Sequence, residues 1–170
     1  MSRLLTLIFA FFSGPAFAQA VAESIRKDEI VHMEDEAPAM RKAFSVARAG
    51  LDDFLKLAKN PPKQFAGFAL KVAVTQGNDT EYFWVTDFAH KGGERFEGDI
   101  NNEPRLVTTV KNGQRYAFTR ARIVDWLYQD KAARKMVGNF TMCALLTQES
   151  KEEAAEVRRL YNLDCSAVGE

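Results

Sequence analysis

The sequence has few of the residues that most reactive sites require. Its 170 residues include two cysteines and two histidines, which are spread over positions 32, 90, 143 and 165. Because this spacing matches no zinc-binding motif, we expect no metal site. No glycine-rich segment has the spacing of a phosphate-binding loop, and Lys91-Gly92-Gly93 is better interpreted as a turn. We therefore expect no cofactor.

A strong overall charge is also missing, since 23 basic residues balance 23 acidic ones. The balance gives no reason to expect nucleic acid as a partner. Charge is uneven locally, because basic residues dominate between positions 105 and 135: Arg105, Lys111, Arg115, Arg120, Arg122, Lys131, Arg134 and Lys135. This basic run fits a face that attracts an anionic envelope polymer or an acidic partner. Alternatively, it is a solvated hairpin surface that discourages strand pairing.

The one long apolar run lies at the N-terminus. Arg3 precedes residues 4–12, which are apolar apart from Thr6, and the chain then reaches the small-x-small sequence Ala16-Phe17-Ala18. This layout is typical of a cleavable signal peptide. As a helix the run rises ~14 Å, against about 30 Å of hydrocarbon in a bilayer. We therefore expect removal of residues 1–18, no transmembrane segment in the mature protein, and a periplasmic or secreted location.

Export would bring the two cysteines into an oxidising compartment. An oxidising destination predicts a disulfide between Cys143 and Cys165, because the cysteines of an exported chain usually pair. The alternative is two separate buried thiols.

Periodicity predicts one α+β domain over residues 37–168, preceded by a flexible lead-in at residues 19–36. Apolar residues at three- and four-residue steps predict a helix from Pro38 to the Pro61-Pro62 pair, with Gly50 as its weak point. Alternating patterns predict strands at residues 68–75, 82–88, around 96, 106–110, 115–118 and 140–146. Residues 123–128 fit either a strand end or a helical turn.

Two local signals complete this prediction. Asn112-Gly113 predicts an antiparallel hairpin between residues 106–110 and 115–118, with Tyr116 and Phe118 on one face. Ser150 to Glu153 reads as a capping box, opening a helix that we expect to bury Ala154, Val157, Leu160 and Tyr161. The order of elements predicts an antiparallel sheet of about five to six strands with an N-terminal and a C-terminal helix packed on it.

Several irregular motifs resemble a known family. They are Phe83-Trp84 with Asp87-Phe88, Phe96-x-Gly98-x-Ile100-x-Asn102-Glu103-Pro104, Gly113, Ile123-x-Asp125-Trp126 and Gly138-Asn139-Phe140-Thr141. On these residues the chain is similar to the YegJ-like family of small exported bacterial proteins. The resemblance covers most of the mature chain from about residue 40. It implies a small α+β domain and carries over no catalytic residues.

Two functions from different classes fit the residues. The first is a non-enzymatic binding or inhibitor-type module, because polar groups beside large aromatic side chains are common in binding sites. Its candidate residues are Trp84, Asp87, Asn102, Glu103, Pro104, Asp125 and Trp126. The alternative for these residues is structural, with an aspartate capping a turn and the tryptophans filling the core.

The second function is a small envelope hydrolase or isomerase. Its acid and base would be carboxylates and His90, brought together only in the fold: Asp87, His90, Glu103 and Asp125. No serine or unpaired cysteine is tied to them by a motif, so we assign no catalytic residue. The enzyme interpretation requires at least two of these side chains within hydrogen-bonding reach of each other.

Overall fold

The structure is a computed structural model that describes residues 37–169, and these residues form a six-stranded antiparallel sheet with three α-helices. The helices and strands, in chain order, are α2 (Pro38–Lys59), β1 (Phe65–Gln76), β2 (Asp79–His90), β3 (Arg95–Ile100), β4 (Arg115–Thr119), β5 (Ile123–Asp130), β6 (Lys135–Gly138), α3 (Phe140–Leu145) and α4 (Lys151–Tyr161). Short 3-10 turns follow β4 and α3. The strand order is β4-β3-β2-β1-β5-β6. The predicted α+β class is confirmed.

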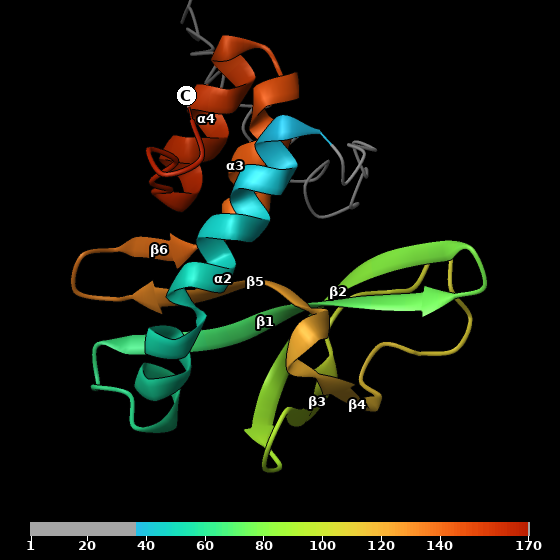
Figure 1. Ribbon diagram of the computed structural model, residues 1–170. Helices are drawn as coiled ribbons and strands as arrows, with labels where there is room; N and C mark the ends of the chain where they lie inside the picture. Colours follow the sequence, from blue (N-terminus) through green and yellow to red (C-terminus); the bar gives the residue numbers. More distant parts are fainter. Residues whose placement is uncertain (1–36, 170) are drawn as a thin grey trace, which may run out of the picture. The chain divides into compact units, whose positions relative to one another are not determined.

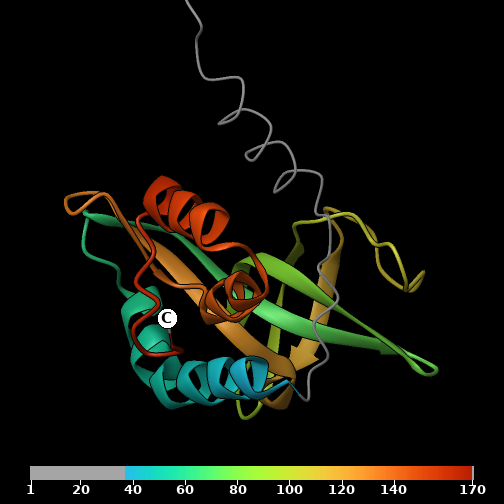
Figure 2. The same ribbon diagram turned by 90° about the horizontal axis from the view of Figure 1, so that it is seen from above.

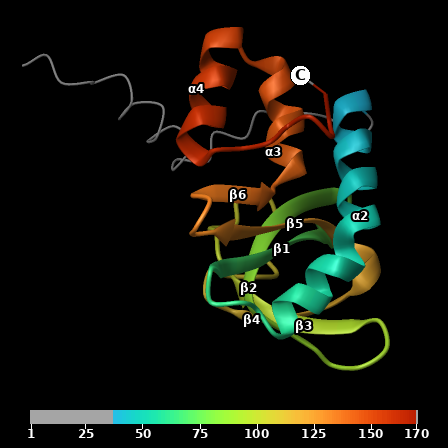
Figure 3. The ribbon, with the colours of Figure 1, turned by 90° about the vertical axis from the view of Figure 1, so that its left-hand side faces the viewer.

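Two of the helices, α3 and α4, lie at the β6 end of the sheet, while α2 runs across β5 and β1, where Phe54 contacts Phe68 and Trp126. Figure 1 shows α3 and α4 beyond β6, with β3 and β4 at the opposite end. Viewed from the side and from above, α3 lies between α2 and α4 (Figures 2 and 3). The sheet core and the α2–α3 contact are separate apolar clusters, the second built on Met40, Ala43 and Ala144.

The first helix follows its predicted pattern. Pro38 occupies its first turn, Lys56 and Lys59 lie in the last turn, and the helix ends before Pro61-Pro62. Gly50 also has a packing role, because a Cβ at this position would lie 2.8 Å from Cζ2 of Trp126. Glycine therefore costs the helix about 1 kcal/mol relative to alanine, but it leaves room for the indole of Trp126.

The predicted Asn112-Gly113 hairpin is wrong. Residues 106–110 form no strand, and β4 pairs instead with β3, with Phe118 opposite Phe96. The 112–113 turn is closed by the amide of Gln114 donating to the carbonyl of Lys111. Gly113 has a φ of +75° and Asn112 is not among the positive-φ residues, whereas a type I′ turn needs positive φ at both. The expected faces of β4 are correct, since Phe118 is buried and Ala117 exposed.

The segment from 135 to 146 also differs from prediction. Residues 140–146 were expected as a strand but form α3 and the start of a 3-10 turn, and β6 before them was not predicted. Asn139 takes a left-handed conformation directly after Gly138, so the chain turns sharply from β6 into α3. Residues 123–128, which fitted two alternatives, belong to β5.

The C-terminal helix begins at the predicted capping box, with reciprocal hydrogen bonds between Ser150 and Glu153. Ala154 and Val157 are buried as expected, whereas Leu160 is 49% exposed. The expectation for Leu160 is therefore wrong, because α4 buries a narrower stripe than its sequence pattern suggests.

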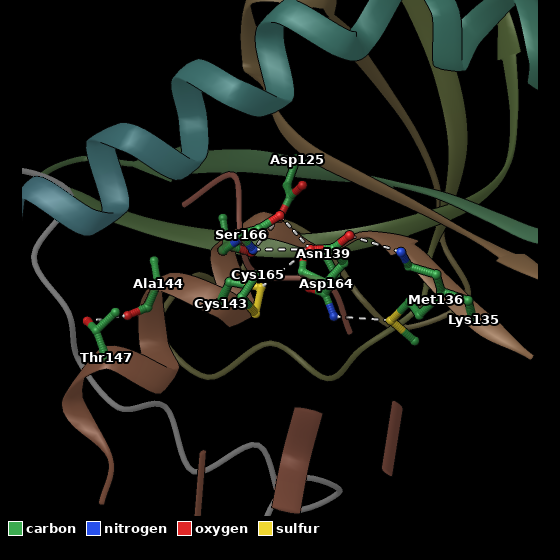
Figure 4. The surroundings of a disulfide bond; sticks show 11 residues. Asp125, Lys135, Met136, Asn139, Cys143, Ala144, Thr147, Asp164, Cys165 and Ser166 are labelled. Carbon is green, nitrogen blue, oxygen red and sulfur yellow. Dashed lines mark hydrogen bonds and ion pairs between the residues drawn. A yellow bond between two sulfur atoms is a disulfide. The ribbon is translucent and has the colours of Figure 1, made fainter. Parts of the chain in front are cut away.

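The predicted disulfide is confirmed. Cys143 of α3 and Cys165 are bonded, with their Cα atoms 5.4 Å apart, and both are buried. Beside the bond, Lys135 pairs with Asp164 at 3.0 Å (Figure 4). The bond therefore fixes the C-terminal segment against α3 and β6.

The predicted signal peptide and lead-in, residues 1–36, lie outside the described residues. Within residues 37–169, no helix has both the length and the apolar character that crossing a membrane requires.

Candidate functional site

A fully buried carboxylate lies at the junction of β5 and α3. Asp125 has no exposed surface, yet its side chain accepts three hydrogen bonds. Oδ1 accepts from the amide of Trp126 at 2.8 Å, and Oδ2 accepts from the amide and the hydroxyl of Thr141, each at 2.7 Å. Because Thr141 is in the first turn of α3, Asp125 supplies the acceptor that the helix N-terminus needs.

The electrostatics of Asp125 combine opposing effects. Burial raises the pKa of this carboxyl, while the positive charge of Lys71 and the hydrogen bonds from Thr141 and Trp126 act to lower it. The carboxyl oxygens are occupied and shielded from solvent. Asp125 therefore suits a structural role better than proton transfer to a substrate.

Lys71 connects this buried network to an aromatic side chain. Lys71 lies opposite Asp125 in the β1–β5 register and opposite Trp84 in the β1–β2 register. Its Nζ donates to the Thr141 hydroxyl at 3.0 Å and lies 5.1 Å from the centre of the Trp84 ring. This distance is that of a cation–π interaction.

The loop after β3 holds Trp84 from the other side. The amide of Trp84 donates to Oδ1 of Asn102 at 2.9 Å, and the carbonyl of Trp84 accepts from the amide of Asn101 at 2.8 Å. Trp84 remains half-buried. We name this arrangement the Lys71–Trp84 site, made of Lys71, Trp84, Asn102, Asp125 and Thr141.

A second buried carboxylate positions the same loop. Glu81 on β2 is 5% exposed and accepts from three consecutive backbone amides, those of Arg105, Leu106 and Val107, at 2.9 to 3.1 Å. Val107 and Val110 then enter the core. Glu81 therefore fixes the path of residues 101–114 beyond the Asn102 contact.

The other predicted binding residues lie elsewhere. Trp126 is 8% exposed, stacks on Phe54 with ring centres 4.9 Å apart and donates to the carbonyl of Ala47 at 2.8 Å. It is thus a core residue, as the structural alternative held. Glu103, followed by the half-buried Pro104, accepts from the Asn112 side chain at 2.9 Å.

Asp87 lies at a bulge in the β2–β3 pairing, with a φ of +45° and a largely exposed side chain that pairs with Arg115. His90 bonds to the carbonyl of Gly93 at 2.6 Å and stacks on Phe96. Within residues 37–169, no hydrogen bond or ion pair joins any two of the enzyme candidates Asp87, His90, Glu103 and Asp125.

Two further features bear on ligands. The described residues contain no cluster of three or more His, Cys, Asp or Glu side chains placed to hold a metal ion. Three of the eight residues of the basic run are paired with carboxylates: Arg115 with Asp99, Arg120 with Asp52, and Lys135 with Asp164. The positive charge of these three residues is therefore partly offset by carboxylates.

Sequence reasoning missed Lys71, Glu81 and Thr141. Glu81 gave a usable signal, because strand alternation places it on the same face as the core residues Phe83 and Val85. Thr141 belongs to the Gly138–Thr141 motif, although its partner was not predictable from spacing. Lys71 gave no signal, because a polar residue on a strand of alternating pattern is expected to face solvent.

The comparisons with known proteins agree with the motif resemblance. Residues 37–165 match a family model described as "Uncharacterized protein conserved in bacteria (DUF2314)". The chain belongs to this bacterial family. It is also 34% identical over 155 residues to "Uncharacterized protein YegJ" of Escherichia coli (strain K12), which covers 91% of this chain and 94% of that protein. No solved structure matches. The DUF2314 match includes every residue of the Lys71–Trp84 site.

Proposed function

We propose that this DUF2314 protein is exported to the periplasm or secreted, and that it acts there as a non-enzymatic binding or inhibitor-type module. The signal-peptide layout of residues 1–18 supports export. The buried disulfide between Cys143 and Cys165 supports it independently, because such bonds persist in oxidising compartments.

The observation that carries the binding role is the Lys71–Trp84 pair. The half-buried indole lies against the Lys71 ammonium, which donates to Thr141, and Asn102 accepts from the backbone amide of Trp84. A positioned aromatic side chain loses little conformational freedom when a partner covers it. Tryptophan is also enriched among the residues that dominate binding energy.

The partner that fits this site best is an envelope protein. A half-buried indole offers apolar area, which suits the apolar centre of a protein surface. An anionic envelope polymer would need several unpaired cations on one face, and three of the eight residues of the basic run are paired with carboxylates. We therefore consider an envelope protein the better-supported partner and an anionic polymer the second candidate.

The hydrolase or isomerase alternative has weaker support. No hydrogen bond joins its four candidates. Both carboxylate oxygens of the buried Asp125 already accept hydrogen bonds. A binding role requires only the surface contact at Trp84. The two functions differ in one measurable respect, namely turnover of an envelope substrate.

Affinity capture tests the proposed function. The mature protein is immobilised and exposed to envelope extract, in parallel with Trp84→Ala and with Leu160→Ala. Leu160→Ala is the matched control, because it truncates an exposed apolar side chain on α4, outside the site. We expect a protein retained by the wild type and by Leu160→Ala but lost from Trp84→Ala.

Two further measurements accompany the capture. N-terminal sequencing of the periplasmic protein should give a chain that begins at Gln19 or Val21, and an uncleaved cytosolic chain would contradict export. A screen of envelope substrates should show no turnover. Turnover abolished in folded Asp125→Asn or Asp87→Asn would replace the binding role with the enzyme alternative.

A further inference from the structure

The outer edge of β4 exposes unpaired backbone groups. Two hydrogen bonds bracket the strand: Ile100 donates to the carbonyl of Gln114 at 3.0 Å, and Arg120 donates to that of Glu94 at 2.8 Å. Antiparallel alternation then directs the backbone groups of Arg115, Ala117 and Thr119 away from β3. Within residues 37–169, no hydrogen bond reaches the outward amides of these three residues or the carbonyls of Arg115 and Ala117, whereas the Thr119 carbonyl begins the 3-10 turn over Arg120–Arg122.

The opposite edge of the sheet is closed by the chain itself. Met136 of β6 forms a parallel bridge with Leu163, and Lys135 pairs with Asp164. The Asn162 side chain donates to the carbonyl of Arg134 at 3.1 Å, and the disulfide holds this segment in place. The β4 edge has no such cover from residues 37–169, and it also lacks proline and a bulge, which commonly block strand addition.

We propose that a second copy of this chain pairs with this edge, β4 against β4 in antiparallel orientation, about a two-fold axis at Ala117. The sequence Arg115-Tyr116-Ala117-Phe118-Thr119 is nearly symmetric about Ala117, with an aromatic residue on each side and a polar residue at each end. Pairing Ala117 with Ala117 of the second copy places Arg115 opposite Thr119 at both ends. These three pairs use the outward backbone groups of both strands and give about four hydrogen bonds without the Thr119 carbonyls, which already accept within the 3-10 turn.

The side chains suit this register. Tyr116 lies opposite Phe118 of the second copy, and aromatic cross-strand pairs stabilise antiparallel sheets. Tyr116 is half-buried and stacked on its own Phe118, with ring centres 6.3 Å apart, so the aromatic row would continue across the axis. No like charges face each other, because Arg115 meets a threonine. Two six-stranded sheets would thus join into one.

Cysteine substitution tests the register directly. The protein is expressed from residues 1–170 and purified as the cell processes it, with its native disulfide intact. Ala117→Cys should form a covalent dimer on mild oxidation, because paired residues at the axis have Cα atoms about 5.5 Å apart. Thr119→Cys is the matched control, since its copies would lie about 13 Å apart and should not bond. Equal cross-linking of the two variants, or none in Ala117→Cys, overturns the proposal.

Sedimentation over a wide concentration range supplies a second test. The wild type should show reversible dimerisation, and Ala117→Pro should remain monomeric, because it removes an outward amide while keeping the bonds to β3. Ala117→Val keeps that amide and should still dimerise. A monomeric wild type, or a dimer that survives Ala117→Pro, contradicts the proposal. Thermal unfolding of the Ala117→Pro monomer confirms that the loss is not unfolding.

Discussion

Gly138 lies directly against Trp126. A Cβ at position 138 would overlap the carbonyl oxygen of Trp126 and approach its Cε3 to 2.7 Å. Gly138 also has a φ of +85°, which other residues rarely adopt. This contact joins the end of β6 to the tryptophan that anchors α2 on the sheet.

We predict that Gly138→Ala destabilises the fold by about 3 kcal/mol, combining overpacking with left-handed strain. Gly92→Ala is the control. It shares a positive φ, but its Cβ would meet nothing within 4 Å, so it should cost only about 1 kcal/mol. Denaturant unfolding measures both, and equal losses would show that the Trp126 contact is unimportant.

The carboxylate of Glu81 should hold the 101–114 loop through the hydrogen bonds that it accepts. We predict that Glu81→Gln destabilises by about 1 to 3 kcal/mol, because the amide nitrogen cannot accept from the buried backbone amides. Amide hydrogen exchange should then accelerate at residues 105–107. Glu103→Gln removes an exposed carboxylate from the same loop and should change stability by less than about 0.5 kcal/mol. Unchanged exchange in Glu81→Gln would refute this role.

The Thr141 hydroxyl joins Asp125 to Lys71. Thr141→Val keeps the side-chain shape and removes both contacts, so we predict a loss of about 1 to 3 kcal/mol. Thr141→Ser restores the hydroxyl and should recover most of the stability. The free energies of unfolding of the two variants provide the comparison, and a loss in Thr141→Ser as large as that in Thr141→Val would contradict this role of the hydroxyl.

Asp164 should make the protein sensitive to acid. Hydrogen bonds from Ser166 and Lys135, together with the Lys135 charge, lower the pKa of Asp164 from 3.8 to about 2. A lowered carboxyl pKa stabilises the folded state above the unfolded value, and this stabilisation is lost as the pH falls toward about 2. Wild type should therefore exceed Asp164→Asn in stability at neutral pH, with the difference vanishing near the lower pKa. A difference that persists unchanged into acid would contradict the assignment.

The predictable parts of the fold depend on local patterns. The α2 helix and the β1 and β2 strands were predictable because their apolar residues recur with the period of a helix or a strand. The capping box was predictable because its two residues are close in sequence. The 140–146 segment could not be separated from a strand in this way, because a short apolar run fits either state. The α3 helix formed by this segment depends on the left-handed turn at Gly138 and Asn139. It also depends on Asp125 of β5, whose carboxylate accepts from the amide of Thr141.

The candidate site was predictable only in part. Trp84, Asn102 and Asp125 were named from the sequence, but their connection passes through Lys71 and Thr141, which are 70 residues apart. The same limit explains the wrong hairpin: Asn112-Gly113 predicts a turn, whereas the partner of β4 is decided by long-range pairing with β3.

The affinity of the captured partner for Trp84→Ala tests the central claim most directly. If the Lys71–Trp84 site is the anchor of the interaction, Trp84→Ala should weaken binding by about 2 kcal/mol or more, while its unfolding midpoint stays close to that of the wild type. Leu160→Ala should bind as the wild type does. A folded Trp84→Ala variant that binds its partner with wild-type affinity would contradict the account.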